Sequence, residues 1–218
     1  MGIHCFPSEF VYWDTVENHT EIKEKLLPII LENSNKTTNN PFDSCKLNTS
    51  LYLNNPEKFV TENNFLTDQK ILNSIVYRNI DNMVNKYNIL DKNTEVDFIL
   101  KNCWWNVYGE NEYQEEHNHY AEPIITDNKI YYPSLSLVYI LHDENEKSSL
   151  IFKRFGTVPL RPPCEDECLL KTEDIKEIKE GTVLIFPCSL RHLVKPCIKP
   201  GRVTIAYNIY TSYQRGYL

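Results

Sequence analysis

The sequence predicts a mainly β protein of the α+β class, a barrel or sandwich of the jelly-roll type buttressed by N-terminal helices. From Val96 onward, short β-rich runs alternate with turn residues such as Gly109 and Gly181. Before that point, two stretches show the apolar spacing of amphipathic helices. The 218 residues suit a single domain, with a helical and loop region at 1–94 supporting a β core at 95–218.

The N-terminal region predicts one strand and two helices. Phe10–Trp13 is expected to form an edge strand, because its residues are apolar and mostly aromatic or β-branched. A first helix is expected over Thr20–Glu32, with Pro28 kinking or ending it. Asp68 or the residue before it caps a second helix that runs to about Tyr87.

The β core is predicted from the second half of the chain, where short β-rich runs alternate with turn residues. Seven runs are the candidate strands: Val96–Tyr108, Tyr113–His119, Ser134–Leu141, Ser149–Phe155, Thr182–Phe186, Leu190–Lys195 and Arg202–Tyr210. The acidic, cysteine-bearing segment Pro162–Lys179 is expected to be an insertion between two of them. The Asn-rich stretch 33–56 is expected to be irregular. We expect this stretch and 160–179 to contact the substrate.

Composition narrows the class of protein. A net charge of −7 makes nucleic acid an improbable partner. Without an apolar run of about 20 residues, no membrane-spanning helix is expected. The N-terminal residues do not resemble a signal peptide, and the seven scattered cysteines suit a reducing, cytoplasmic compartment. Cys164 and Cys168 lack a second pair of ligands to complete a zinc site.

Three histidines are the candidate metal ligands. His117 and His119 are two positions apart, so in a strand their side chains share a face. An exposed polar strand face would give the same pattern without a metal. His192 follows an apolar strand and a turn, which favours its return to the mouth of a barrel. The competing third ligand, His142, stands beside acidic residues and is expected to be solvated.

Arg202 is the candidate carboxylate-binding residue. The alternation that begins there places Arg202, Thr204, Ala206 and Asn208 on one strand face and apolar residues on the other. An arginine among small neighbours is typical of a carboxylate-binding pocket. Its guanidinium N–H groups and the Thr204 hydroxyl would both donate hydrogen bonds to the carboxylate. A surface arginine on an exposed strand face is the alternative.

Together these residues resemble the iron(II)/2-oxoglutarate-dependent oxygenases, whose fold is the double-stranded β-helix, a cupin-like jelly roll. That family has a His-x-Asp/Glu pair, a distal His, and an Arg or Lys about ten residues later. The counterparts here are His117-Asn118-His119, His192 and Arg202-Val203-Thr204. The resemblance covers Val96 to Tyr210 and is closer to a partly phage-borne branch, which suggests a virus- or phage-encoded protein in a host cytoplasm.

The resemblance also implies cosubstrate contacts. Asn106-Val107-Tyr108 is similar to the Asn-x-Tyr element with which the alkylation-repair demethylases hold 2-oxoglutarate, so Asn106 and Tyr108 take that role here. Tyr139 is expected to line the same pocket. Asn208 completes the Arg-(five residues)-Asn layout of the closer branch.

His119 departs from the family pattern, which has a carboxylate at this position. Either the site uses three histidines, which suits iron because imidazole is one of its usual ligands, or a carboxylate comes from elsewhere. The candidates are Glu115, Glu116 and Glu122, and Glu115 has the correct strand parity. We prefer the three-histidine interpretation.

The resemblance implies an enzyme that binds Fe(II), 2-oxoglutarate and O₂, oxidises an unidentified substrate, and releases succinate and CO₂. Two alternatives remain at this point. One is a three-histidine cupin dioxygenase, similar to the thiol dioxygenases, that needs no cosubstrate and uses Arg202 for its substrate. The other is a non-catalytic cupin-like binding or structural module.

Overall fold

The computed structural model describes residues 9–35, 47–51, 64–87, 94–144, 150–153 and 169–215. Residues 36–46 and 52–56 of the first stretch and 160–168 of the second lie outside these described residues, as do Cys164 and Cys168. Within the described part, no helix has both the length and the apolar character needed to cross a bilayer.

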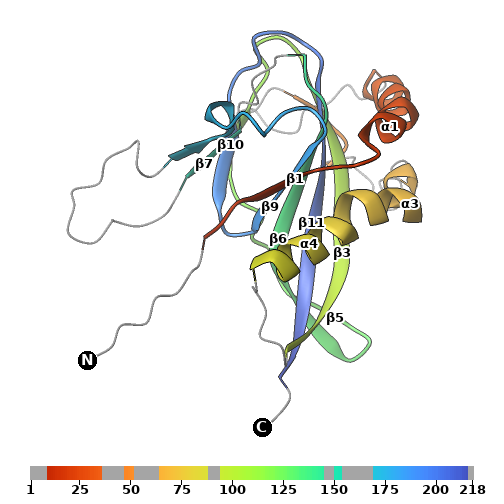
Figure 1. Cartoon of the computed structure of the whole chain (residues 1–218), viewed down its shortest axis with the longest axis vertical. Coiled ribbons are helices and arrows are strands. Elements are labelled where there is room, and N and C mark those ends of the chain that lie inside the picture. Colours follow the sequence, from red (N-terminus) through yellow and green to blue (C-terminus); the bar gives the residue numbers. More distant parts are fainter. Residues whose placement is uncertain are drawn as a thin grey trace, which may run out of the picture.

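Two antiparallel sheets form the β core (Figure 1). The larger sheet has the order β1-β9-β6-β11-β3-β2, with β5 paired to β6, and the smaller has the order β4-β10-β7-β8. The strands of the larger sheet are β1 (Tyr12–Thr15), β2 (Asn48–Thr49), β3 (Thr94–Tyr108), β5 (Ile124–Thr126), β6 (Lys129–His142), β9 (Thr182–Pro187) and β11 (Arg202–Arg215). Those of the smaller sheet are β4 (Gln114–His117), β7 (Leu150–Lys153), β8 (Leu169–Lys171) and β10 (Arg191–Val194).

Helices cover the outer face of the larger sheet (Figure 1). Helix α1 (His19–Ser34) is followed, after β2, by a nearly continuous helical stretch made of η1, α3, the π-helical turn η2, and α4. The bounds of these four are Asn64–Thr67, Gln69–Leu72, Asn73–Tyr77 and Arg78–Tyr87, and a short 3₁₀ turn, η4, spans Thr172–Asp174. Asp68 caps this stretch by accepting from the backbone N–H groups of Lys70 and Ile71.

Strand alternation divides the apolar residues into two cores. Residues such as Trp105, Ile185 and Val203 face outward and pack against α1 and α3. Their sequence neighbours Leu184 and Phe186 face the smaller sheet. Strand β9 is almost entirely apolar because both of its faces are covered. The chain is therefore layered as helices, larger sheet and smaller sheet.

Most predicted elements are confirmed, and the differences have local causes. Pro28 does not end α1, which continues to Ser34. Pro28 lies on the exposed side of the helix, and burial of Leu26 and Ile30 on the other side stabilises the turns around it.

Three strands were not predicted. Strands β2 and β8 are only two and three residues long, and β8 lies within the stretch expected to be an insertion. Strand β5 pairs with β6 through a tight turn in which Asp127 and Asn128 have φ of 51° and 59°. That Asp-Asn pair is a hairpin signal, and it is the feature of the sequence from which β5 was predictable.

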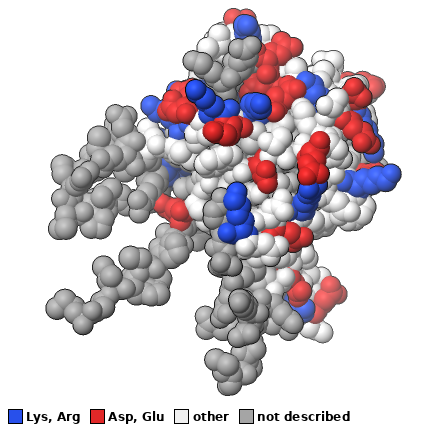
Figure 2. Space-filling model, viewed as in Figure 1, with Lys and Arg blue, Asp and Glu red and all other residues white. Residues whose placement is uncertain are grey.

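Charged side chains of both signs are interspersed on the face shown in Figure 2. Within the described part of the chain, charges pair across elements, for example Lys25 with Asp68 and Lys195 with Glu173. Exposed pairs of this kind contribute at most about 1 kcal/mol each. On this face the mixture offers no extended cationic surface to a phosphate backbone.

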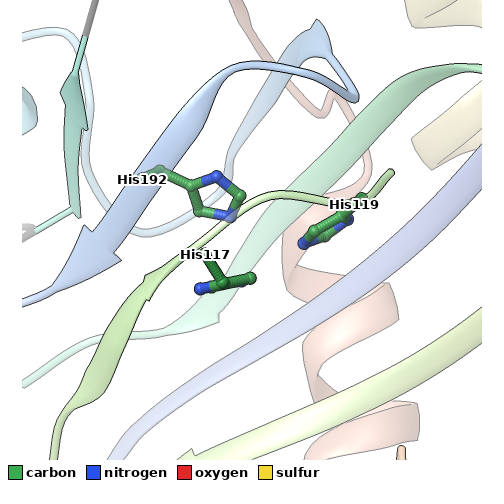
Figure 3. Close-up of side chains that lie close together, drawn as sticks. All are labelled: His117, His119 and His192. Atoms are coloured by element: carbon green, nitrogen blue, oxygen red, sulfur yellow. The ribbon is translucent and has the colours of Figure 1, made fainter. Parts of the chain in front are cut away.

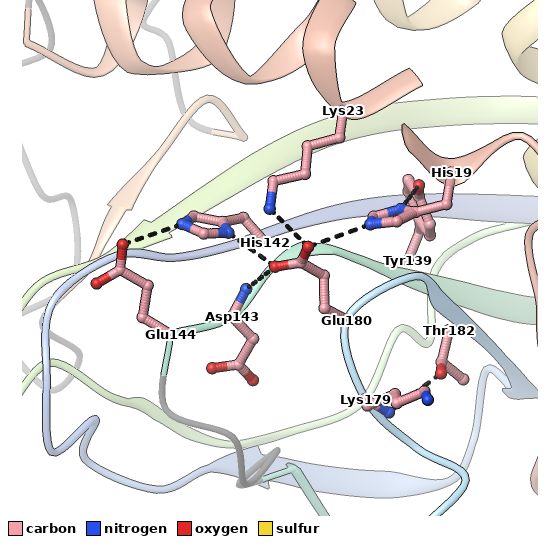
Figure 4. A network of polar contacts seen from close by, with 9 residues as sticks. All are labelled: His19, Lys23, Tyr139, His142, Asp143, Glu144, Lys179, Glu180 and Thr182. Atoms are coloured by element: carbon pink, nitrogen blue, oxygen red, sulfur yellow. Dashed lines mark hydrogen bonds and ion pairs between the residues drawn. The ribbon is translucent and has the colours of Figure 1, made fainter. Parts of the chain in front are cut away.

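A polar cluster around Glu180 fastens the start of α1 to the β core (Figure 4). The Glu180 carboxylate accepts from Lys23 Nζ at 2.5 Å and from the Asp143 backbone N–H at 3.0 Å. It also contacts His142 Nδ1 at 2.8 Å and His19 Nε2 at 3.3 Å. Burial by itself would raise the pKa of the Glu180 carboxyl, but these four contacts outweigh burial and lower the pKa to about 2.

We therefore expect Glu180→Gln to lower the free energy of unfolding by about 1–3 kcal/mol at pH 7, because it removes the charge that these donors share. The folded-state pKa is depressed, so the contribution is complete above the ordinary value of 4.5 and is lost as the pH falls toward 2. Urea unfolding of wild type and variant at pH 7, 5 and 3.5 measures this. A difference in stability that stays constant over the series would contradict the assignment.

Candidate metal centre and adjoining pocket

The three candidate ligands meet between the two sheets (Figure 3). His117 ends β4, His192 lies opposite it in β10, and His119 follows two residues after His117. One ring nitrogen from each residue lies within 4.8 Å of the others. Among the described residues this is the one group of three or more His, Cys, Asp or Glu side chains with that geometry.

Each imidazole is held through its Nδ1 atom. His117 Nδ1–H donates to the Glu115 carbonyl at 2.8 Å, and His192 Nδ1–H donates to the Leu190 carbonyl at 3.0 Å. An oxygen acceptor at Nδ1 places the proton there and leaves a lone pair on Nε2. This is the tautomer that a metal ligand requires.

His119 is held differently because β4 ends at His117. Its backbone N–H donates to the Cys188 carbonyl at 2.9 Å, so the loop is fastened to the turn after β9. Its Nδ1–H donates to Asn208 Oδ1 at 2.7 Å, and Ser136 Oγ lies 2.9 Å from the same nitrogen. The prediction that one strand carries both histidines is wrong in this detail, but both imidazoles still face His192.

Burial keeps the three imidazoles neutral. It lowers the pKa of His119 to about 4, with a further contribution from His117. The pKa of His192, which is 3% exposed, lies well below its ordinary value for the same reason. The pKa of His117 is also lowered by burial. Neutral imidazole is the form that binds metal, so no deprotonation is needed at pH 7.

The acidic alternatives are not part of this group of ligands. The Glu116 carboxylate pairs with Lys153 and Arg191 instead. The side chain of Glu122 is exposed. Glu115 holds His117 through its backbone carbonyl, and its carboxylate does not line the pocket. Its Oε2 atom is buried and has no hydrogen-bond partner within the described part of the chain.

A small pocket, open at its mouth, adjoins the three histidines. Its floor is formed by facing residues of β3 and β11, which pair as Tyr108 with Arg202, Asn106 with Thr204, and Trp104 with Ala206. The predicted alternation of β11 is confirmed, because Arg202, Thr204 and Ala206 line the pocket while Val203 and Ile205 face the helices.

Arg202 is the cationic side chain of this pocket. It is 1% exposed, and its guanidinium carbon lies 5.6 Å from the centre of the Tyr108 ring. Beside it, Asn106 Nδ2 lies 3.5 Å from Thr204 Oγ1, and Asn106 Oδ1 has no hydrogen-bond partner among the described residues. A buried cation next to a hydroxyl that can donate is a suitable environment for an anionic ligand.

Two predicted pocket residues lie elsewhere. Tyr139 faces the helices, because odd-numbered residues of this part of β6 point that way, and its hydroxyl lies 2.6 Å from His19 Nδ1. Its neighbour Val138 lines the pocket instead. Asn208 lies on the predicted strand face, but its amide oxygen is engaged with His119. Asn208 is therefore a positioning residue for a candidate ligand.

Two polar residues of the site were missed from the sequence. Gln114 lines the pocket together with His117, although strand parity separates them, because the β4–β10 register is irregular at this point. Its Oε1 atom accepts from Tyr108 Oη at 3.1 Å, and its Nε2 atom lies 3.4 Å from His117 Nε2. Ser136 supports His119 from β6, and only the sheet pairing brings it there.

Removing the support of His119 should weaken metal binding. We expect Asn208→Ala to raise the dissociation constant for a divalent metal by about 10- to 100-fold, the usual effect of losing such a partner. Asn208→Asp keeps an acceptor for Nδ1–H and should retain most of the affinity. Competition with a chromogenic chelator measures both variants. Wild-type affinity in Asn208→Ala would show that Ser136 alone orients the ring.

The sequence matches no family model and no curated protein. Solved structures share its fold. An oxidoreductase of the 2OG-Fe(II) oxygenase family from Burkholderia pseudomallei is 14% identical, with 94% of this chain and 85% of that chain covered and a TM-score of 0.51. HygX from Streptomyces hygroscopicus, with nickel and 2-oxoglutarate bound, is 12% identical, with 91% and 81% covered and a TM-score of 0.50. The predicted double-stranded β-helix fold is confirmed.

Proposed function

We propose that this chain, which has the fold of the 2OG-Fe(II) oxygenases, is itself an Fe(II)- and 2-oxoglutarate-dependent oxygenase. One observation carries the proposal: three neutral imidazoles, with one ring nitrogen of each within 4.8 Å of the others, share a pocket with a buried arginine. The imidazoles suit a divalent transition metal, and the arginine suits a carboxylate. The substrate that is oxidised is not identified by these features.

In this proposal His117, His119 and His192 hold Fe(II). The bound metal and 2-oxoglutarate supply the oxidising chemistry with O₂. Arg202 and Thr204 bind the distal carboxylate of 2-oxoglutarate. The Tyr108 ring packs against the guanidinium group and keeps it within the pocket. Asn106 belongs to the next pair of facing residues along β3 and β11, closer to the histidines, and presents its side-chain amide to the same ligand.

The surrounding residues exclude water and fix orientation. Leu150 and Val194 of the smaller sheet give the pocket an apolar wall, and Val138 adds apolar surface beside Ala206 in the larger sheet. Apolar surroundings strengthen the electrostatic interaction between Arg202 and a bound carboxylate, because few water molecules are present to screen the two charges. The chain of contacts from Tyr108 through Gln114 to His117 joins the carboxylate end of the pocket to the metal end.

The test is anaerobic addition of Fe(II) and then 2-oxoglutarate to the purified protein. A weak visible charge-transfer band that saturates with 2-oxoglutarate is expected, followed by succinate formation once O₂ is admitted. Stoichiometric iron binding without this band would contradict the cosubstrate assignment. Failure to bind any divalent metal would leave the three histidines as structural residues of a binding module.

A second candidate function follows from the all-imidazole set of ligands. Three-histidine sites without a carboxylate also suit a cupin dioxygenase that oxidises its substrate directly and needs no 2-oxoglutarate. Arg202 would then hold the carboxylate of the substrate. Product analysis separates the two, since only the first function forms succinate in proportion to O₂ consumed.

A further inference from the structure

The side chain of Gln114 forms a hydrogen-bonded bridge between the two ends of the pocket. Its Oε1 atom accepts from Tyr108 Oη at 3.1 Å, and its Nε2 atom lies 3.4 Å from His117 Nε2. Tyr108 pairs with Arg202 in the β3–β11 ladder, whereas His117 is one of the three candidate metal ligands. Gln114 therefore contacts one residue at the carboxylate end and one at the metal end.

The contact with His117 uses the lone pair that a metal ion needs. His117 Nδ1–H donates to the Glu115 carbonyl at 2.8 Å, so the Nε2 atom carries no proton and can only accept. Because the Tyr108 hydroxyl donates to Oε1 of Gln114, the amide presents its N–H group to His117. The ring has one lone pair at Nε2, so this hydrogen bond and a metal ion exclude each other.

The other two candidate ligands are not held in this way. Within the described part of the chain, His117 is the one of the three whose Nε2 atom has a hydrogen-bond partner. The contact depends on the irregular β4–β10 register, in which His117 pairs with His192 and Gln114 pairs with Val194. The extra residue in β4 brings Gln114 and His117, three positions apart, to the same side of the sheet. Strand pairing therefore builds the contact into the fold.

The Tyr108 hydroxyl is also a group for which two acceptors compete. It has a single O–H to donate, and Gln114 Oε1 accepts from it. The Tyr108 ring lies 5.6 Å from the guanidinium carbon of Arg202, so a carboxylate held by that arginine lies beside the tyrosine. A carboxylate accepts more strongly than a neutral amide oxygen. It would draw the hydroxyl away from Gln114 and loosen the amide at His117.

We infer that Gln114 is a positioning residue that links occupation of the metal site to occupation of the carboxylate site. Its amide holds His117 Nε2 until a metal ion displaces it. A carboxylate at Arg202 makes that displacement easier, because it takes the Tyr108 hydroxyl. The inference rests on the proposed function, which supplies both ligands. Coupling of this kind is reciprocal, so a metal ion at His117 also favours carboxylate binding.

The experiment measures the affinity of the full chain for Co(II) by anaerobic competition with a chromogenic chelator, with and without saturating 2-oxoglutarate. The test variant is Gln114→Leu, which keeps most of the side-chain volume and has no amide. Without 2-oxoglutarate we expect it to bind Co(II) about three- to fivefold more tightly than wild type, because the metal no longer displaces a hydrogen bond.

Saturating 2-oxoglutarate should bring the two proteins together. Chelation of the metal by 2-oxoglutarate is common to both, so it cancels in the comparison. We expect the difference in Co(II) affinity to fall below about twofold, because the carboxylate has already loosened Gln114 in wild type. A merely structural role for Gln114 predicts the opposite sign, since loss of a supporting side chain would weaken metal binding in both conditions.

Glu116→Gln is the matched control in the same strand. The Glu116 carboxylate pairs with Lys153 and Arg191, and the residue does not line the pocket. We expect this variant to bind Co(II) with wild-type affinity in both conditions. Circular dichroism compares the fold of the wild type and the two variants.

A second measurement uses the wild type alone and so does not depend on the folding of a variant. Nitrogen NMR of protein that carries isotope-labelled histidine reports whether each ring nitrogen accepts a hydrogen bond. Before metal is added, we expect His117 Nε2 to have the chemical shift of a hydrogen-bonded acceptor. Addition of 2-oxoglutarate alone should move this shift toward that of a free acceptor.

Three outcomes would overturn the inference while the proposed function stands. One is a Gln114→Leu variant that, without 2-oxoglutarate, binds Co(II) no more tightly than wild type. Another is a gain in affinity that is equally large with 2-oxoglutarate. The third is a His117 Nε2 atom that has the shift of a free acceptor in the wild type. If wild type binds neither Co(II) nor 2-oxoglutarate, the proposed function fails and the inference falls with it.

Discussion

Replacing His192 with alanine is expected to raise the dissociation constant for Fe(II) or Co(II) by at least about 100-fold, since loss of a mere supporting partner already costs 10- to 100-fold. His192 is buried, and its Nδ1–H is fixed on the Leu190 carbonyl, so its Nε2 atom is presented to the pocket without rearrangement. Anaerobic competition with a chromogenic chelator measures the change, and inductively coupled plasma analysis of the purified variant gives the metal content.

The matched control is His142→Ala. His142 also lies at the end of a strand, but its ring contacts Glu180 and Glu144 and lies outside the cluster of three histidines. We expect this variant to lose some stability and to keep wild-type metal affinity, with circular dichroism confirming the fold of both proteins. Equal metal affinity in His192→Ala and wild type would place the metal somewhere other than between the two sheets.

The second large effect is expected at the other end of the pocket. Arg202→Ala should weaken 2-oxoglutarate binding by about 100-fold or more, because removing one partner of a buried, charge-assisted pair costs about 2–5 kcal/mol. Arg202→Lys should recover only part of the affinity, because an ammonium group lacks the planar fork that matches a carboxylate. Titration of the visible band with 2-oxoglutarate measures both variants, and metal affinity should stay unchanged.

Arg191→Ala is the control for this experiment. Arg191 immediately precedes a candidate ligand, but its guanidinium pairs with Glu116 at 2.5 Å instead of lining the pocket. We expect 2-oxoglutarate affinity to remain at the wild-type value in this variant. Equal losses in the Arg191 and Arg202 variants would indicate a general effect of positive charge and would refute a specific carboxylate contact at Arg202.

Much of the architecture was predictable because it depends on local periodicity. The alternation of β11 assigned Arg202 and Thr204 to one face and Val203 to the other, and the sheet keeps that assignment. The apolar spacing of the second helix and the cap at Asp68 are also local, and both are present. Each of these features depends on residues within one or two turns or strand repeats of one another.

The sequence by itself determined the fold class, which three histidines are the candidate metal ligands, and the strand face on which Arg202 lies. The tertiary structure decided which side chains and backbone groups contact these residues. His119 lies beyond the end of its strand and is positioned by Asn208 and Cys188, which are distant in the chain. Tyr139 does not line the pocket as predicted, because the register of β6 directs its side chain toward α1. Contacts of this kind depend on which strands pair and in which register, and pairing between distant segments leaves no local pattern in either of them.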